Sequence, residues 1–152
     1  MTVMAEASDP PPPKKFELPV EVLGADIDEL GHANNTVYLR WIQDVAVAHS
    51  VAVGLGVEAY RAIGAVFVVR RHEIDYLRPA LRGDKLLLRT WLDSIFAAKC
   101  RRVTEIVRVE GGSETTIAHA ITTWGCVEIA TGRPTRIPPE IRDAFAGHIK
   151  TA

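Results

Sequence analysis

Residues 36–53 constrain the fold more than any other part of this chain. Apolar residues recur there at helical spacing along one face, which predicts an α-helix: Tyr38, Trp41, Ile42, Val45, His49 and Ala52. The opposite face is hardly polar, because Leu39, Val47 and Val51 interrupt it. A helix that is apolar on most sides is expected to be buried on most sides. At its length it spans roughly 27 Å, so we expect it to cross the whole domain.

The rest of the chain carries strand patterns. After Gly64 the sequence becomes rich in Val and aromatic residues, and Gly-containing turns separate four predicted strands: residues 65–78, 86–95, 99–110 and 114–130. The short gaps predict hairpins and an antiparallel sheet. Residues 16–23 add a strand, which Pro19 places at a sheet edge or a bulge. We therefore predict an α+β fold, in which a sheet of about five strands wraps around one long central helix. A short C-terminal helix should carry Ile141 and Phe145 on one face.

Length and composition fit one globular domain. The chain has 152 residues, of which 47% are apolar and 24% charged, and this is enough to bury a core. Its formal net charge of −1 predicts no binding to nucleic acid or to an anionic membrane. The sequence contains neither a secretory signal nor an apolar segment that could span a bilayer. We therefore expect a cytoplasmic protein.

The N-terminal segment and the two cysteines complete the organisation of the chain. Residues 1–15 include four consecutive prolines at 10–13, which favour an extended polyproline conformation. We interpret residues 1–15 as a mobile tail and residues 16–150 as a single domain. Cys100 and Cys126 have no metal-ligand spacing and are expected to be buried free thiols.

The polar segment from Asp26 to Asn35 holds the candidate site. It places two Asp carboxylates, a glycine, a histidine and two asparagines directly before the long helix. Asn favours the N-cap position, so the segment predicts a loop that leads into a helix N-terminus, where free amides and the helix dipole attract negative charge. A carboxylate beside such amides suits a base or nucleophile acting on a carbonyl that they polarise. Ordinary turn and capping roles would also explain Asp26, Asp28 and Asn34.

The same segment carries a resemblance to a known family. The pattern Asp-x-Asp-x-x-Gly-His-x-Asn-Asn-x-x-Tyr-Leu-Arg at residues 26–40 resembles the signature of the hot-dog fold acyl-CoA thioesterases, the 4-hydroxybenzoyl-CoA thioesterase-like family. Residues 74–80 and the Gly-Asp turn at 83–84 resemble the second strand of that family and the turn after it. The resemblance implies a hot-dog fold and thioester hydrolysis without a metal or cofactor. It also implies homodimers or homotetramers with active sites shared between subunits.

The resemblance assigns catalytic roles within the loop. Asp28 matches the essential carboxylate of the family and would act either as a nucleophile, which gives a mixed anhydride, or as the general base for water. His32 would hydrogen-bond the thioester or position Asp28. A backbone amide at Asn35 or a neighbour would donate to the developing oxyanion. Asp26 is expected to brace the loop.

Substrate contacts are expected from a wider set of residues: Gly31, Asn34, Tyr38, Arg70 and Arg101. Gly31 would let the backbone turn sharply or approach the acyl group, and Asn34 would cap the helix. Arg70 and Arg101 would suit the phosphates of coenzyme A, although a solvated sheet face explains them as well. The chain departs from the family at Gln43, where many relatives carry Glu, so a second catalytic carboxylate is not expected there.

The sequence leaves two other functions open. One is a hot-dog dehydratase or hydratase, although the pattern of His and acidic residues typical of those enzymes is not found here. The other is a non-catalytic protein that binds acyl thioesters, which a turnover assay would distinguish from an enzyme. The acyl group (aromatic, short or long) and its carrier (coenzyme A or acyl-carrier protein) are also left open.

Overall fold

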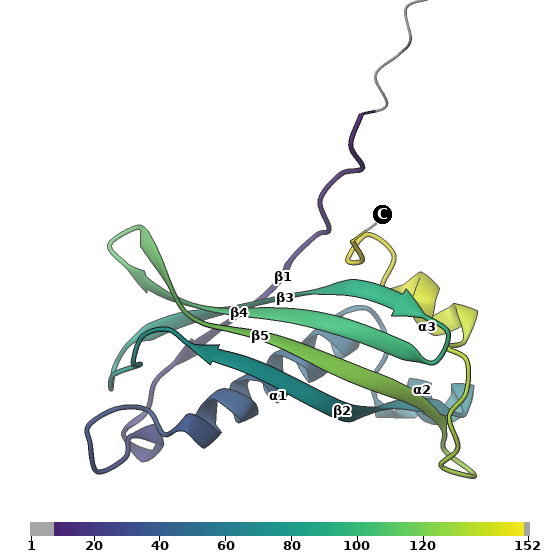
Figure 1. Ribbon diagram of the computed structural model, residues 1–152, viewed down its shortest axis with the longest axis horizontal. Helices are drawn as coiled ribbons and strands as arrows, with labels where there is room; N and C mark the ends of the chain where they lie inside the picture. The colour runs from purple at the N-terminus through teal and green to yellow at the C-terminus, as the bar shows by residue number, and fades with distance from the viewer. Residues whose placement is uncertain (1–7, 151–152) are drawn as a thin grey trace, which may run out of the picture.

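The computed structural model describes residues 8–150 and shows one antiparallel sheet with a long helix across one face (Figure 1). The strands are β1 (Phe16–Glu21), β2 (Ala65–Tyr76), β3 (Lys85–Phe96), β4 (Lys99–Glu110) and β5 (Ser113–Glu128). The helices are α1 (Asn35–Ala52), α2 (Val57–Ile63) and α3 (Pro139–Ala144), and a single 3-10 turn covers Gly24–Asp26. The predicted α+β class, the five strands and the long helix are confirmed.

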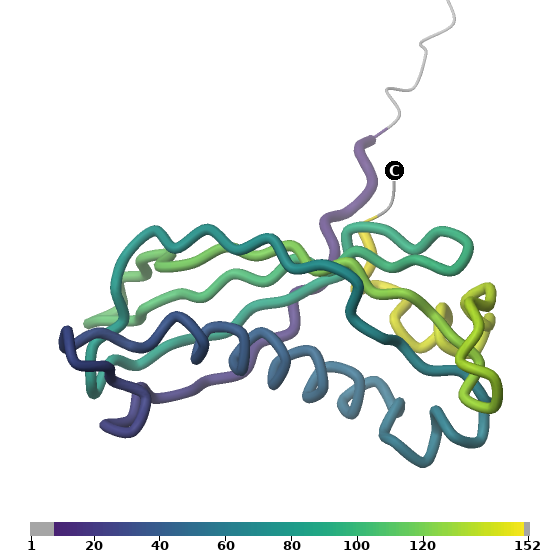
Figure 2. The backbone as a smooth tube through the Cα atoms, turned by 60° about the horizontal axis from the view of Figure 1, so that its bottom comes forward, coloured from purple at the N-terminus to yellow at the C-terminus, as the bar shows by residue number. Residues whose placement is uncertain are grey.

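The strands lie in the order β1-β3-β4-β5-β2, and every neighbouring pair is antiparallel. Among the described residues, β1 pairs only with β3, so Pro19 lies on an edge strand, where proline is tolerated. β2 forms the other edge. Figure 2 shows the sheet curving over α1, which runs along its concave face. The sheet therefore wraps around the helix as predicted.

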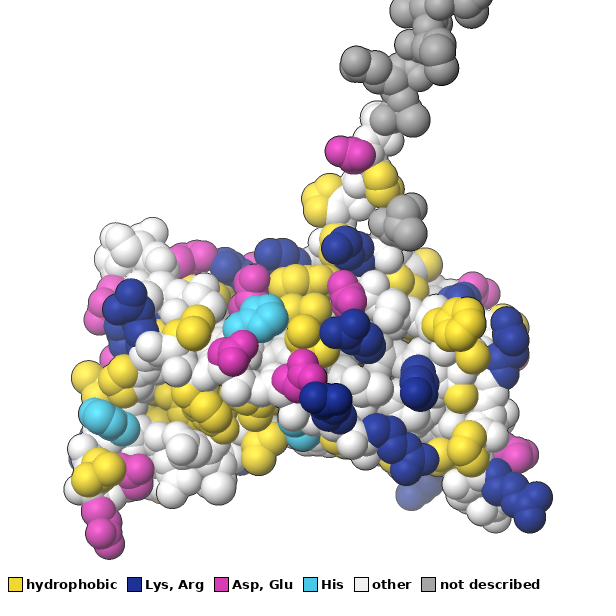
Figure 3. All heavy atoms as spheres, viewed as in Figure 1, with side chains coloured by type: hydrophobic (Ala, Val, Ile, Leu, Met, Phe, Trp, Pro, Cys, Tyr) yellow, Lys and Arg dark blue, Asp and Glu magenta, His cyan; other side chains and the backbone are white. Residues whose placement is uncertain are grey.

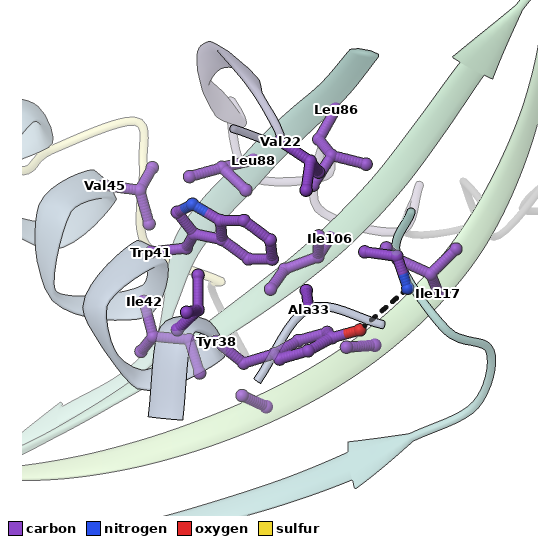
Figure 4. Packing of buried hydrophobic residues seen from close by; sticks show 14 residues of the cluster. Val22, Ala33, Tyr38, Trp41, Ile42, Val45, Leu86, Leu88, Ile106 and Ile117 are labelled. Atoms are coloured by element: carbon purple, nitrogen blue, oxygen red, sulfur yellow. Dashed lines mark hydrogen bonds between the residues drawn. The ribbon is translucent and has the colours of Figure 1, made fainter. Parts of the chain in front are cut away.

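The main core lies between α1 and the inward face of the sheet. Trp41, Ile42 and Val45 of α1 are buried, and they pack in one cluster with Leu88 of β3 and Ile106 of β4 (Figure 4). Full burial of one such side chain contributes about 1.5–3 kcal/mol to stability. This cluster fixes α1 against the sheet, and it thereby fixes the position of the helix N-terminus.

The outward face of α1 differs from the expectation. Leu39, Val47 and Val51 are 39%, 54% and 58% exposed, because one curved sheet covers only one side of the helix. The prediction that α1 is buried on most sides is therefore wrong for the single chain. Ala52, expected on the buried face, is also exposed, because it is the last residue of the helix.

A second apolar cluster joins the far end of the sheet to α3. Ile141 and Phe145 are buried in it, as predicted, together with Cys100 and Cys126, which are free thiols.

The short helix α2 was not anticipated. Gly64 ends it in the left-handed conformation, with φ of 83°. Within the described residues, no helix is both long and apolar enough to cross a membrane.

The N-terminal arm is held near its junction with β1. The backbone N–H of Lys14 donates to the Gly147 carbonyl (2.7 Å), and the Lys14 carbonyl lies 2.9 Å from Nδ1 of His148. These contacts join the predicted tail to the C-terminal segment of the domain. Residues 1–7 of that tail lie outside the described residues.

Candidate active site

The loop before α1 is a tight turn that the backbone itself closes. Ile27 and Ala33 form an isolated antiparallel bridge, and the N–H of Asp28 donates to the His32 carbonyl (2.8 Å). The turn is completed by the N–H of Gly31, which donates to the Asp28 carbonyl (3.1 Å). Gly31 has φ of +80°, a conformation that glycine adopts without steric cost. The sharp turn predicted at Gly31 is therefore present.

Asp28 is half-buried at the start of this turn. One of its carboxylate oxygens, Oδ1, accepts hydrogen bonds from the N–H of Leu30 (2.9 Å) and of His32 (3.4 Å). Within the described part of the chain, no hydrogen bond is recorded for the other oxygen, Oδ2. The turn thus holds the carboxylate by one oxygen and leaves the second one free to react.

Asp26 braces the loop from inside. Its carboxylate is 3% exposed and accepts hydrogen bonds from the Leu23 N–H (2.9 Å) and from Nη2 of Arg40 on α1 (2.8 Å). Burial opposes ionisation, but the bonds from Arg40 and Leu23 outweigh it and hold the pKa of Asp26 below its ordinary value. The Asp26 carbonyl also accepts the Asn34 N–H (2.9 Å). Asp26 therefore ties the loop to the first turns of the helix through both its side chain and its backbone carbonyl.

The N-terminus of α1 presents an uncovered amide. Asn34 is the N-cap, and its Oδ1 accepts from the Thr36 N–H (3.0 Å) and the Thr36 hydroxyl (2.9 Å). The Val37 N–H donates to the Asn34 carbonyl (2.9 Å). Among residues 8–150, no acceptor is recorded for the N–H of Asn35, the first helical residue. An amide in this position can donate to a bound oxyanion without breaking a bond of the fold.

Tyr76 belongs to the site although its sequence pattern did not indicate it. It lies at the end of β2, is 46% exposed, and its hydroxyl is 3.4 Å from the Asn35 carbonyl. Its ring also contacts Tyr38 edge to face, with 5.1 Å between the ring centroids. The contact joins residues far apart in sequence, so only the fold could bring Tyr76 to the helix start.

The remaining loop residues divide into exposed and buried positions. The side chains of His32 and Asn35 are exposed, and no side-chain contact between His32 and Asp28 is recorded in the described chain. Tyr38 is buried, and its hydroxyl accepts the Ala80 N–H (3.1 Å; Figure 4). Burial raises the pKa of that hydroxyl. Tyr38 thus anchors the segment after β2 to the helix, and its predicted contact with substrate gains no support from this position.

Arg70 and Arg101 lie on the outer face of the sheet, and Figure 3 shows several Lys and Arg side chains gathered on one part of the face that it views. Arg101 is opposite Thr123 on β5, and the side chain of Arg70 lies against Gly125. Arg101 is also opposite Ser94, at the far end of β3 from the Asp28 loop. That separation is roughly 30 Å along the strand. The two arginines are therefore not brought to the Asp28 loop within one chain.

The segments around Asp28 and Asn35 expose several large apolar side chains: Leu23, Leu30, Leu77 and Leu81. The Ala33 N–H donates to the Ala80 carbonyl (2.8 Å), so the loop and the segment after β2 are bonded side by side. Among the residues that the structure describes, no group of three or more His, Cys, Asp or Glu side chains is placed to hold a metal ion. The site thus combines a carboxylate, a free amide and apolar surroundings.

Family comparison identifies the reaction that the chain catalyses. A model of the thioesterase-like superfamily matches residues 22–145, which include the loop and all of α1. The chain belongs to this superfamily. It is a thioester hydrolase, and the family expected from residues 26–40 is confirmed.

Two curated relatives match this thioesterase over most of its length. Long-chain acyl-CoA thioesterase FadM of Escherichia coli (strain K12) is 24% identical over 131 residues, which cover 86% of this chain and 97% of FadM. Acyl-acyl carrier protein thioesterase ATL3, chloroplastic, of Arabidopsis thaliana is 22% identical over 134 residues, which cover 88% of this chain and 69% of ATL3. Both relatives hydrolyse acyl thioesters according to their names, but the names specify different carriers.

Solved structures confirm the hot-dog fold of this thioesterase. The dynemicin thioesterase superposes with a TM-score of 0.81 at 22% identity, covering 91% of this chain and all of that chain (100%). The 1,4-dihydroxy-2-naphthoyl-CoA thioesterase Slr0204 from Synechocystis superposes with a TM-score of 0.77 at 20% identity, covering 87% and 96%. At these identities the likeness shows the arrangement of sheet and helix.

Proposed function

We propose that Asp28 drives acyl-thioester hydrolysis and that the Asn35 amide stabilises the oxyanion. One observation carries this proposal. A carboxylate with one unbonded oxygen lies in the turn that leads directly into a helix N-terminus whose first amide has no recorded acceptor in the described chain. The pair supplies a reactive oxygen and an electrophilic donor, the two groups that attack on a thioester carbonyl requires.

Two routes are consistent with this arrangement. In the first, Oδ2 of Asp28 bonds to the carbonyl carbon, the C–S bond breaks, and the thiolate departs. The product is a mixed anhydride between the acyl group and Asp28, which water then hydrolyses. In the second, Asp28 takes a proton from water while the water oxygen bonds to the carbonyl carbon. The C–S bond then breaks, and the proton held by Asp28 passes to the departing thiolate. In both routes the carbonyl oxygen becomes negative and accepts from the Asn35 N–H.

We propose acyl-coenzyme A as the substrate, with an acyl-carrier protein thioester as the alternative carrier. FadM supports the first carrier and ATL3 the second. Arg70 and Arg101 are proposed contacts for the phosphates of either carrier. Because they lie at the far end of the sheet from Asp28 of the same chain, this role requires that a second subunit bring its own loop near them.

A homodimer or homotetramer is therefore proposed as the active assembly. The outward face of α1 exposes Leu39, Val47 and Val51, and β2 is an open edge of the sheet. Open edges and contiguous apolar faces favour pairing with another chain. A second copy that covers both features would bury this apolar face. His32, exposed beside the site, is a proposed thioester contact in this assembly.

Release of free thiol from a panel of acyl-CoAs tests the function, with Asp28→Asn as the decisive variant. We expect the variant to fold normally and to lose about 10²- to 10⁴-fold in kcat. Glu29→Gln is the matched control, because Glu29 is an exposed carboxylate on the same turn. Near-normal kcat in folded Asp28→Asn protein would contradict the assignment. A single turnover in ¹⁸O-water then tests the anhydride route: ¹⁸O incorporated into the Asp28 carboxylate shows that an anhydride formed and that water opened it at the Asp28 carbonyl.

A further inference from the structure

A cavity of about 220 Å³ lies between the second half of α1, α2 and the inward face of the sheet. Most of its lining is apolar: Val47, Val51, Leu55, Phe67, Leu92 and Phe145. Val47 and Val51 belong to the exposed face of α1, so the cavity borders that face. An apolar cavity of this kind suits a hydrocarbon chain. The polar groups at its wall then decide which chain it accepts.

Arg102 of β4 lines this cavity as a buried cation without a buried anion. The residue is 5% exposed. Its Nη1 donates to Nδ1 of His49 (2.8 Å) and to the Thr90 hydroxyl (3.0 Å), both neutral acceptors. No carboxylate of the described residues forms an ion pair with it within 4.0 Å, although ten such pairs are present elsewhere. Burying an unpaired charge is costly.

Arg102 remains charged at neutral pH despite its burial, and the groups around it leave that charge unbalanced. Burial, together with the nearby Arg102 and His148, lowers the pKa of His49 to about 3, so this ring is neutral at neutral pH. Burial lowers the pKa of Arg102 to about 10, which still leaves the guanidinium protonated at neutral pH. The guanidinium only donates hydrogen bonds. A negatively charged acceptor is therefore the group that this wall of the cavity lacks.

Trp124 supplies a second, independent indication of a missing acceptor. It lines the same cavity, and its indole Nε1 is buried with no hydrogen-bond partner in the described chain. Trp124 pairs with Cys100 across β4 and β5, and this makes it the diagonal neighbour of Arg102 on the inward face. Two adjacent donors on one cavity wall, neither matched by an anion, favour one ligand with acceptor oxygens.

We propose that this cavity binds the far end of a long acyl group that ends in a carboxylate, with Arg102 and Trp124 as the residues that select it. The inference rests on the proposed thioesterase function and names its substrate class: thioesters of dicarboxylic acids. Along α1, the cavity-lining residues Gln43 to Ser50 lie roughly 12 to 22 Å beyond Asn35. A carboxylate bound there is far from the thioester, so the connecting chain must be long.

Hydrolysis of dodecanedioyl-CoA and dodecanoyl-CoA compares two chains that differ only at the far end. We expect the wild-type enzyme to favour dodecanedioyl-CoA in kcat/KM, mainly through KM. Arg102→Met removes the charge while keeping the apolar stem, and should lower kcat/KM for dodecanedioyl-CoA by about 30-fold or more. Dodecanoyl-CoA should be hydrolysed at least as well as before. Arg61→Met is the matched control, because Arg61 is exposed on α2 and pairs with Glu58.

Binding of monomethyl dodecanedioate and methyl dodecanoate, measured by calorimetry in the Asp28→Asn variant, tests the cavity without turnover. The first ester carries a carboxylate at its far end only, and the second carries none. Monomethyl dodecanedioate should bind more tightly, and adding Trp124→Phe should weaken only its binding. This milder variant keeps the test decisive even where Arg102→Met fails to fold. Equal affinity for the two esters would overturn the inference, as would an unchanged substrate preference in folded Arg102→Met. Tight binding of monomethyl dodecanedioate without hydrolysis of any acyl-CoA by the wild-type enzyme would refute the proposed function alone.

Discussion

Replacing Asn35 with proline removes the backbone N–H hydrogen from the proposed oxyanion site, together with the Asn35 side chain. Proline has no backbone N–H, so the substitution deletes the donor that the helix start is proposed to aim at the thioester. Asn35→Ala is the matched partner, because it removes the side chain and keeps the amide. The two variants therefore separate a backbone role from a side-chain role at one position.

The structure indicates that both variants fold. Asn35 is the first residue of α1, where proline is well tolerated. The preceding residue, Asn34, has φ of −59° and ψ of 140°, a conformation that proline allows in the residue before it. Both changes keep the cap bond, which the Thr36 N–H donates to Asn34 Oδ1, and the contact of the Asn35 carbonyl with the Tyr76 hydroxyl. We expect the free energy of unfolding of each variant to lie within about 0.5 kcal/mol of the wild-type value.

The expected effect on the rate is large for proline and small for alanine. Loss of one preorganised oxyanion donor costs about 3 to 4 kcal/mol, or roughly 10²- to 10³-fold in kcat. Asn35→Ala should stay within about threefold, because an exposed side chain without a catalytic role contributes little. The measurements are kcat and KM by free-thiol release, and urea denaturation to establish folding. Equal, large losses would assign the role to the side chain. Equal, small losses in folded proteins would refute the Asn35 amide as donor.

Three further outcomes follow from the contacts described above. Asp26→Asn should lower the free energy of unfolding by about 1–3 kcal/mol at pH 7. In urea titrations, the difference in this free energy between wild type and variant should shrink below about pH 4, because the lowered pKa of Asp26 confers stability that is lost as the carboxylate is protonated. Burial lowers the pKa of His49 to about 3 in the folded protein, whereas a histidine in the unfolded chain binds a proton below about pH 6.5. As the pH falls from about 6.5 toward 3, the free energy of unfolding of wild type should therefore fall by up to about 1.4 kcal/mol per pH unit. His49→Gln should flatten this slope, and His119→Gln should not. Light scattering should give at least twice the 16.7 kDa chain mass, and Leu39→Glu should lower it; a fully active wild-type monomer would contradict the shared site.

The elements with strong periodicity were predictable almost to the residue. The helix expected at 36–53 is Asn35–Ala52, and the strand expected at 99–110 is Lys99–Glu110. Helical and strand patterns persist there over many residues, so local preference and burial agree. The helix α2 was missed because it is short, lies between Gly56 and Gly64, and buries none of its residues completely. The order of the strands depends on long-range pairing, which the pattern along the chain does not show.

The candidate site was predictable where it is local and not where it is assembled by the fold. The cap at Asn34 and the sharp turn at Gly31 follow from neighbouring residues, which is why the sequence indicated both. Tyr76 reaches Asn35 from the end of β2. Arg102 lies on β4, a strand that the sequence predicted, but a sequence does not show whether an inward arginine meets a carboxylate. Such pairings require the three-dimensional neighbours.

The two ends of α1 divide the proposed work of the enzyme. Its N-terminus carries the free amide of Asn35, where a developing negative charge would be stabilised. Its second half forms one wall of the cavity that contains Arg102. Because both sites belong to one rigid helix packed on one sheet, the distance between them is constant. A fixed distance between the reacting carbonyl and a charged anchor would select the length of the acyl chain as well as its terminal group. Dicarboxylyl-CoAs of increasing length should therefore show a single optimum in kcat/KM, and Arg102→Met should abolish that optimum.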